Sequence, residues 1–434
     1  MSNTILALIQ NRPGSITPDP DTGMGGGSGT IEDPYLIATP EQLHNLRNFP
    51  SAYFKQVRHL NLAPHILEDF SWYDPIGGWQ PFGPVWGDPF NGYFDGNGYT
   101  IQNMFINRPS VAHQGFFTGL GPTASIHNLK ILNATVTGGQ KAGLLAGYIN
   151  GSTVDDIVLS GSVTGNGRTG GITGESTGAS ALISDIVFTG TVTGVGWLTG
   201  GAVGFNSGNW QNCTVQAVVE CSGGGGGFAG ENTGSLIRCS KYGSLLTSGG
   251  NVGGFASINS GDIYQCRVVG DLIAGAGNLG GFSNTNSGNI RESIAIGNVS
   301  GAGWNIGGFI NTNTGLLENS YALVNISSTT SGYAILVVSN RGTTRYCFSA
   351  GTRTGGNPNQ TSGGIYENNA GIRCYHDSTL SQDFRLNRTI PKTTKELKAG
   401  AIPDLDIFVD WSSEIWNTVD IATYPKLQWE LEGV

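Results

Sequence analysis

Apolar residues recur along this chain at intervals of 26 to 29 residues. Each interval ends at a position that holds Leu, Ile, Cys or Ser, and in the first eight repeats another apolar residue stands three positions earlier. A further apolar residue usually follows two positions later, and such alternation is typical of β-strands. The ten positions of this ladder are Leu129, Ile157, Ile186, Cys213, Cys239, Cys266, Ser293, Ser320, Cys347 and Cys374.

Two more ladders run beside the first. A phenylalanine follows a Gly-Gly pair at steps of 27 residues, at Phe228, Phe255, Phe282 and Phe309. An asparagine followed by Ser or Thr and then Gly recurs at steps of 26 or 27 residues, at Asn206, Asn232, Asn259, Asn286 and Asn313. We expect the phenylalanines in the interior and the asparagines in hydrogen-bonded stacks beside turns. Ligand binding by the asparagines is the alternative.

A repeat of this length with about three short strands cannot bury its own apolar face. Stacked coils can, because each strand then pairs with its counterpart one coil further on. The sequence therefore predicts an all-β, parallel β-solenoid. At about 4.8 Å per coil, the steps from Leu129 to Cys374 span roughly 43 Å.

Several phrases of the sequence resemble the GLUG-motif repeats of bacterial and phage surface proteins. They are Ala142–Gly147 (AGLLAG), the recurring Gly-Gly-Phe…Asn-Ser-Gly…Cys pattern, the entry phrases near residues 29–43 and 94–101, and the ending near residues 411–429. The resemblance covers about residues 29–434. It implies a β-helical fold, right-handed, with an extracellular or virion-surface role, chiefly adhesion, and it brings no catalytic residues with it.

Five segments are expected from these patterns. Residues 1–16 are a possible anchoring segment or a disordered tail, and residues 17–29 read as a flexible Pro/Gly linker. Residues 30–125 form an N-terminal cap with irregular first coils, including a short helix that starts after the cap residue Thr39. Residues 126–376 form the solenoid. Residues 377–434 form the C-terminal cap, with a helix near residues 393–399.

Composition narrows the class of function. The chain holds 70 glycines among 434 residues, 12% charged residues and a net charge of −9. It has no cluster of basic residues, so we expect no nucleic-acid partner. No apolar stretch is long enough for a membrane span, and the N-terminus is a poor signal peptide. A virion protein assembled in the host cytoplasm needs no signal, which favours a virion.

The cysteine ladder admits three interpretations. Cα atoms about 4.8 Å apart on stacked coils lie within the disulfide range, so Cys213–Cys239 and Cys347–Cys374 are possible pairs. A metal site is the second interpretation. The same ladder accepts Leu, Ile and Ser, however, which favours inward packing of free thiols and no bound metal or cofactor.

Tryptophans supply the candidates for binding. Trp72, Trp79 and Trp86 lie in an aromatic-rich stretch that suits either sugar faces or packing of the N-terminal cap. Trp197 and Trp304 stand between turn residues, each eleven positions past a ladder position. We expect them to be exposed enough to hold glycans. They are four coils, roughly 19 Å, apart, so they cannot share one small-sugar site.

Catalytic candidates are few. Asp156 and Asp185 occupy equivalent positions on adjacent coils, and carboxylates about 5 Å apart would suit a retaining glycosidase. A solvated turn is the alternative interpretation.

The sequence as a whole predicts a non-enzymatic structural or adhesive β-solenoid on a particle surface. A bacteriophage fibre, spike or capsid decoration is the favoured setting. Its partners would be other virion or cell-surface proteins through residues 1–29, a bacterial surface glycan, and copies of itself. A secreted bacterial adhesin and a polysaccharide depolymerase of a tailspike are the alternatives.

Overall fold

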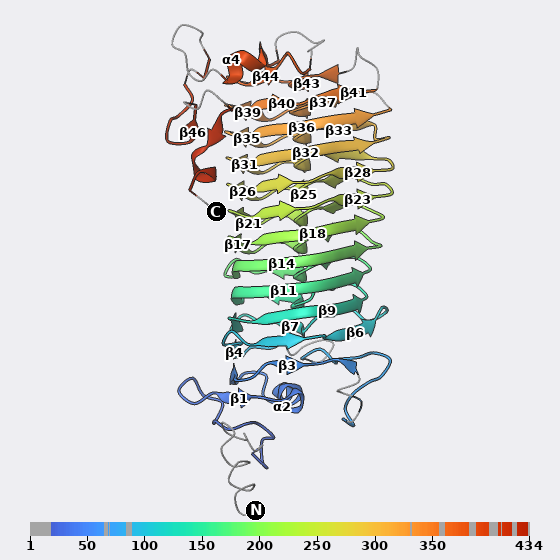
Figure 1. Cartoon of the computed structure of the whole chain (residues 1–434), viewed down its shortest axis with the longest axis vertical. Helices are drawn as coiled ribbons and strands as arrows, with labels where there is room; N and C mark the ends of the chain where they lie inside the picture. Colours follow the sequence, from blue (N-terminus) through green and yellow to red (C-terminus); the bar gives the residue numbers. More distant parts are fainter. Residues whose placement is uncertain are drawn as a thin grey trace, which may run out of the picture.

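The computed structural model describes residues 19–64, 68, 70–83, 89–329, 332–355, 361–381, 388–398, 407–408, 410–418 and 423–432. These residues form a stack of parallel strands that rises from the N-terminal to the C-terminal end (Figure 1). Every pairing within the three large sheets is parallel and joins one coil to the next, apart from isolated bridges. The predicted parallel β-solenoid is thus confirmed.

One face of the solenoid is a ten-stranded sheet in which each coil contributes a strand of four or five residues. Its strands are β7 (Phe117–Leu120), β10 (Ala146–Asn150), β13 (Thr173–Thr177), β16 (Val203–Asn206), β20 (Ala229–Asn232), β25 (Ala256–Asn259), β30 (Ser283–Asn286), β34 (Ile310–Asn313), β38 (Val337–Asn340) and β43 (Ile365–Asn368).

A second face is an eight-stranded sheet of very short strands, six of which end on the first glycine of a Gly-Gly pair. Its strands are β12 (Thr169–Gly170), β15 (Thr199–Gly200), β19 (Gly225–Gly226), β24 (Val252–Gly253), β29 (Asn278–Gly280), β33 (Asn305–Gly307), β37 (Tyr333–Ala334) and β42 (Thr361–Ser362).

The widest face is a sheet in which 27 strands are described. Its strands are β1 (Tyr35–Ile37), β2 (Tyr53–Gln56), β3 (Leu60–Asn61), β4 (Tyr93–Asp95), β5 (Thr100–Gln102), β6 (Phe105–Arg108), β8 (Ser125–His127), β9 (Lys130–Gly138), β11 (Thr153–Gly165), β14 (Leu182–Gly194), β17 (Asn209–Gln211), β18 (Thr214–Cys221), β21 (Ser235–Ile237), β22 (Ser240–Tyr242), β23 (Leu245–Thr247), β26 (Asp262–Tyr264), β27 (Arg267–Val269), β28 (Leu272–Ala274), β31 (Asn289–Arg291), β32 (Ile294–Gly301), β35 (Leu316–Glu318), β36 (Tyr321–Ser328), β39 (Thr343–Arg345), β40 (Phe348–Ala350), β41 (Arg353–Thr354), β44 (Tyr375–Asp377) and β45 (Ile390–Lys392).

The ladders form the interior of the stack. Phe282 lies between Phe255 and Phe309 with ring centroids 4.9 and 4.7 Å away. The buried asparagines pass one hydrogen bond from coil to coil, as when Asn259 Nδ2 donates to Asn286 Oδ1 over 2.8 Å. The fold therefore stacks identical side chains directly on one another, which satisfies each buried amide with the next.

A left-handed residue turns the wide sheet just before each ladder position. Its φ lies between 48° and 55° in ten successive coils, and it is Asn, Asp, Glu, Gln, Arg or Tyr. This bend points one side chain outward and the next one inward. The ten residues are Asn128, Asp156, Asp185, Asn212, Arg238, Gln265, Glu292, Asn319, Tyr346 and Arg373.

The N-terminal end is closed by helix α2 (Pro40–Asn45) and the 3₁₀ turn η1 (Leu46–Asn48). Thr39 caps the helix by accepting a hydrogen bond from the amide of Gln42, as expected. Residues 19–29 are not the open linker that the sequence indicates. Met24 is fully buried, and the amides of Gly25 and Leu36 donate to Leu36 O and Gly26 O. Residues 1–16, the possible anchor, lie outside the described residues, as do residues 17–18 of the expected linker.

The C-terminal segment does more than cap the opposite end. Strand β45 and helix α4 (Thr394–Lys398) lie at the end of the stack, and the chain then returns along its side (Figure 1). There the antiparallel pair β46 (Trp416–Asn417) and β47 (Lys426–Leu427) leads into η4 (Gln428–Glu430). Trp416 and Trp429 donate their indole N–H to Asn319 Oδ1 and Glu292 O. The predicted cap at residues 377–434 is thus part cap and part lateral strap.

Candidate functional site

The cysteine ladder lies in the interior. All six cysteines are free and buried, and Cys213 Sγ lies 3.2 Å from Gln211 O. Burial raises the pKa of the Cys213 thiol well above its usual value, so this thiol stays neutral. Within the described residues, no three His, Cys, Asp or Glu side chains come together as a metal site.

The aromatic-rich N-terminal stretch does not present Trp79 to a ligand. Trp79 is 1% exposed and makes an edge contact with Phe82, with ring centroids 5.5 Å apart. Trp72 is half-buried and stacks on His44 at 4.0 Å. The binding hypothesis is wrong for Trp79, because core packing covers its ring. Trp86 lies outside the described residues.

Trp197 and Trp304 both project from the solenoid, with 79% and 76% of their surface exposed. They lie on turns between the wide sheet and the eight-stranded sheet. The turns that follow the arrowheads of β14 and β32 lie along one edge of the stack, at the right in Figure 1.

The turn that carries Trp197 is one residue longer than its neighbours. Gly194 pairs with Gly165 and Cys221, and Thr199 pairs with Thr169 and Gly225. Five positions separate the paired residues in this coil, against four in each adjacent coil. Leu198 takes a φ of 65°, which is rare for a bulky residue. The same spacing of five recurs in the coil that carries Trp304, between Gly301 and Ile306.

A groove of about 520 Å³ lies beside this turn. Its lining comes from the turns of three successive coils: Gln140, Lys141, Asn166, Gly167, Arg168, Gly196, Trp197 and Leu198. Sequence reasoning found Trp197 but not this groove. The signal that could have found it is the pair of basic residues Lys141 and Arg168, 27 positions apart and hence on adjacent coils.

Asp156 and Asp185 occupy the left-handed bend before the ladder, with φ of 51° and 55°. Both side chains are exposed, and Asn212 of the next coil donates to Asp185 Oδ1 over 3.2 Å. Asp and Asn tolerate this backbone conformation better than other residues with a Cβ. The bend therefore explains why aspartate stands at both positions. The same position holds Asn, Arg or Tyr in other coils.

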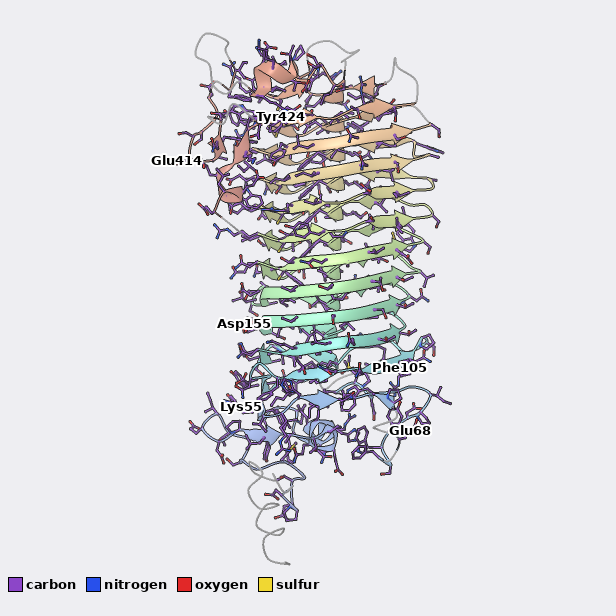
Figure 2. The ribbon with its side chains drawn as sticks, viewed as in Figure 1. Lys55, Glu68, Phe105, Asp155, Glu414 and Tyr424 are labelled. Atoms are coloured by element: carbon purple, nitrogen blue, oxygen red, sulfur yellow. The ribbon has the colours of Figure 1, made fainter. Side chains whose placement is uncertain are left out.

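A Ser–His–Asp set that sequence reasoning missed lies nearby. Ser125 Oγ contacts His127 Nε2, and His127 Nδ1 contacts Asp155 Oδ1. Figure 2 shows Asp155 at the edge of the stack, on the same side as Glu414 and several coils below it. The three groups meet in the order used by serine hydrolases. The signal was a Ser-x-His strand with an aspartate in register one coil later.

The backbone around this set is engaged in the sheet. The amide of Ser125 donates to Gly92 O at 3.0 Å, and the amide of Thr153 donates to Ala124 O at 3.1 Å. In serine hydrolases the nucleophile's own amide is commonly free to stabilise the oxyanion. Ser125 therefore lacks that donor in this structure.

Comparisons with known proteins give the chain no family. No family model matches it. It is 32% identical over 157 residues to Halomucin of Haloquadratum walsbyi, covering 36% of this chain and 2% of that protein. It is 35% identical over 130 residues to a protein of Evansella cellulosilytica named "Putative Gly-rich membrane protein", covering 29% of this chain and 14% of that protein. The chain thus spans only a small part of either relative.

A solved structure with a similar course is that of a "putative immunoglobulin A1 protease" from Bacteroides ovatus. The TM-score is 0.35 at 17% identity, over 93% of this chain and 94% of that one. Similarity at this level transfers no activity. In the described part of the chain, the helices are too short or too polar to cross a bilayer.

Proposed function

We propose that this chain is a non-enzymatic, adhesive β-solenoid that projects from a surface and attaches to a glycan. The observation that carries the proposal is the exposed indole of Trp197 on a turn at the edge of a regular stack of strands. Aromatic faces pack well against the apolar faces of sugars. Few surface charges and no metal cluster among the described residues fit recognition through shape and stacking.

The proposal also covers which particle or cell displays the protein. The likeness to GLUG-motif repeats fits a bacteriophage virion, whose other proteins would hold residues 1–29, and it fits a bacterial cell surface equally. The relative named as a membrane protein favours a bacterial cell surface. Immunogold labelling of intact virions and of intact producing cells separates the two settings.

The test of the adhesive function is retention on intact bacterial cells. The purified chain is incubated with cells and with their extracted polysaccharide, and bound protein and new reducing ends are recorded together. Retention without new reducing ends supports the proposal. New reducing ends would make it a depolymerase, with Asp156 and Asp185 as the first residues to replace, and no retention would exclude adhesion to those cells.

A hydrolase is the second candidate, and the Ser125–His127–Asp155 contacts favour it. Its test is labelling by a fluorophosphonate probe, which reacts with activated serines. We expect no labelling, because the Ser125 amide is engaged with Gly92 O. Labelling that disappears in Ser125→Ala and persists in Ser152→Ala, a buried serine, would establish the hydrolase instead.

A further inference from the structure

We propose that the groove beside Trp197 binds a carboxylate-bearing sugar, such as a uronic or sialic acid unit of a surface glycan. This inference rests on the proposed adhesive function and names its ligand class. The groove's volume of about 520 Å³ lies within the roughly 300–1,000 Å³ of small-molecule sites. Its lining combines an aromatic ring, two cations and two amides, which is the chemistry of an acidic sugar.

The cations are held by an outward-facing stack on the ten-stranded sheet. Tyr148, Glu175 and Phe205 are register partners on β10, β13 and β16. Lys141 Nζ lies 3.1 Å from Glu175 Oε2 and 5.9 Å from the Tyr148 ring centroid. Arg168 pairs with the same carboxylate oxygen, and its guanidinium lies 4.4 Å from the Phe205 ring centroid.

In this arrangement two cations contact one carboxylate, and the next acid of the column, Glu231, lies one coil beyond Phe205. Two cations share the single carboxylate of Glu175, whose side chain is 13% exposed, while the Arg168 side chain is 37% exposed. Burial and the neighbouring Lys141 lower the pKa of His113, so this histidine adds no charge at neutral pH. A ligand carboxylate would accept hydrogen bonds from the guanidinium.

The other wall is suited to a sugar ring. The Trp197 indole stands beside Gly196 and is 79% exposed, so a ring can stack on it without displacing protein atoms. Asn166 and Gln140 are exposed at the groove, and their amides can donate to and accept from hydroxyl groups. A neutral sugar would satisfy the indole and the amides but leave the cationic side of the groove unused.

The backbone of the groove is held in place before any ligand arrives. Lys141 and Leu198 take left-handed φ values of 60° and 65°. Gly174 packs directly against the backbone of Lys141, where a Cβ would lie only 2.4 Å from Lys141 Cα. Pre-ordered turns reduce the entropy lost on binding.

The test is binding of defined oligosaccharides to the full chain. The probes are oligogalacturonate and oligosialic acid, their methyl esters, and a neutral galactan oligomer. We expect binding of at least one acidic oligomer, weaker binding of its ester, and loss of affinity by about tenfold or more in Trp197→Ala. Arg168→Gln should weaken binding of the acid and remove most of its salt dependence.

The matched control is Trp304→Ala, which removes an equally exposed indole from the same edge of the stack. It should leave affinity unchanged. Equal binding of acid and ester, equal loss in Trp304→Ala, or no binding of either acidic oligomer would overturn the inference. Binding of an acidic peptide such as oligoglutamate, competing with the sugar, would show that charge and not the sugar is recognised, and this would also overturn it.

This failure can be told apart from failure of the proposed function. If intact cells retain wild type and Trp197→Ala equally, the chain is adhesive but the groove is not its site. If cells retain neither protein, the adhesive function itself is wrong for those cells.

Discussion

Two parts of the solenoid follow different rules. From Asn206 to Asn340 the coils advance by 26 or 27 residues, and a buried asparagine stacks on the next one in every coil. Between Phe117 and Asn206 the corresponding steps of the ten-stranded sheet are 27 to 30 residues. The groove, which includes the Trp197 turn, and the Ser–His–Asp set lie in or beside the second part. The regular coils stiffen the rod, and the candidate binding and catalytic residues lie where the repeat length varies.

The physical reason is that a coil is constrained by the coils above and below it. Glycines of neighbouring coils approach so closely that a Cβ at Gly281 would lie 2.0 Å from Gly308 O. In such a stack an altered side chain must suit two neighbours at once. An insertion at a turn escapes this constraint because it extends outward, and there a large ring or a charge is tolerated.

The largest expected effect is in the stacked phenylalanines. Phe282→Asp places a charge between two rings in a site with no exposed surface. We expect a loss of at least about 4 kcal/mol in the free energy of unfolding, or failure to fold. Denaturant unfolding measures it, with the milder Phe282→Leu as a variant that should fold. Ile258→Asp, at a 37% exposed site on β25, is the control. Equal stability of Phe282→Asp and wild type would reverse our assignment of inside and outside.

The second-largest loss of stability is expected at the buried asparagines, and it should exceed the loss at asparagines on the surface. Asn259→Ala removes one buried hydrogen bond from Asn232, which donates to Asn259, and one from Asn286, which accepts from it, each over 2.8 Å. We expect a loss of about 2–4 kcal/mol. Asn278→Ala interrupts a similar row on the surface, where Asn305 donates to Asn278 over 3.2 Å, and should cost less than about 1 kcal/mol. Thermal unfolding of both variants decides whether burial, and not asparagine stacking as such, stabilises the rod.

A third prediction concerns a buried lysine within the regular coils. Lys241 is fully buried where Val215 and Val268 stand in the adjacent coils, and burial lowers its pKa to about 7. Between about pH 7 and pH 10.5 the unfolded chain binds more protons at this residue, so stability should rise with pH.

Lys241→Met should therefore be more stable than wild type by about 1–3 kcal/mol at or below pH 7. The difference should shrink as the pH rises towards 10.5. Unfolding midpoints at several pH values measure it. A variant that is less stable than wild type at pH 7 would show that the contact of Nζ with Gly243 O outweighs the cost of burial.

The smallest expected effect is at the left-handed bend. Asp185→Asn should change stability by less than about 0.5 kcal/mol, because Asn tolerates the same φ. Asp185→Val should cost about 1–2 kcal/mol, since a β-branched residue disfavours that conformation. Calorimetry on the two variants measures this difference. Equal stability of the two variants would contradict the backbone role.

The repeat was predictable because it can be read directly from the spacing of residues along the sequence. Positions such as Phe282 recur at a nearly constant spacing, because each coil pairs with the next. The lateral strap was not predicted, because it docks on one outward register position of the wide sheet. That position holds Ile294, Tyr321, Phe348 and Tyr375 under the strap and residues such as Val187, Thr214 and Ser240 in earlier coils. The groove and the Ser125–His127–Asp155 set arise between coils, and their members are recognisable only once the register is known.

The most direct test of this account is hydrogen–deuterium exchange of the full chain with and without the acidic oligosaccharide probes. The account predicts added protection confined to the turns at residues 139–142, 166–168 and 195–199, with the coils from residue 206 to 340 unchanged. Protection centred on those regular coils would contradict it, because the ligand would then be held by the part of the solenoid to which we assign stiffness alone.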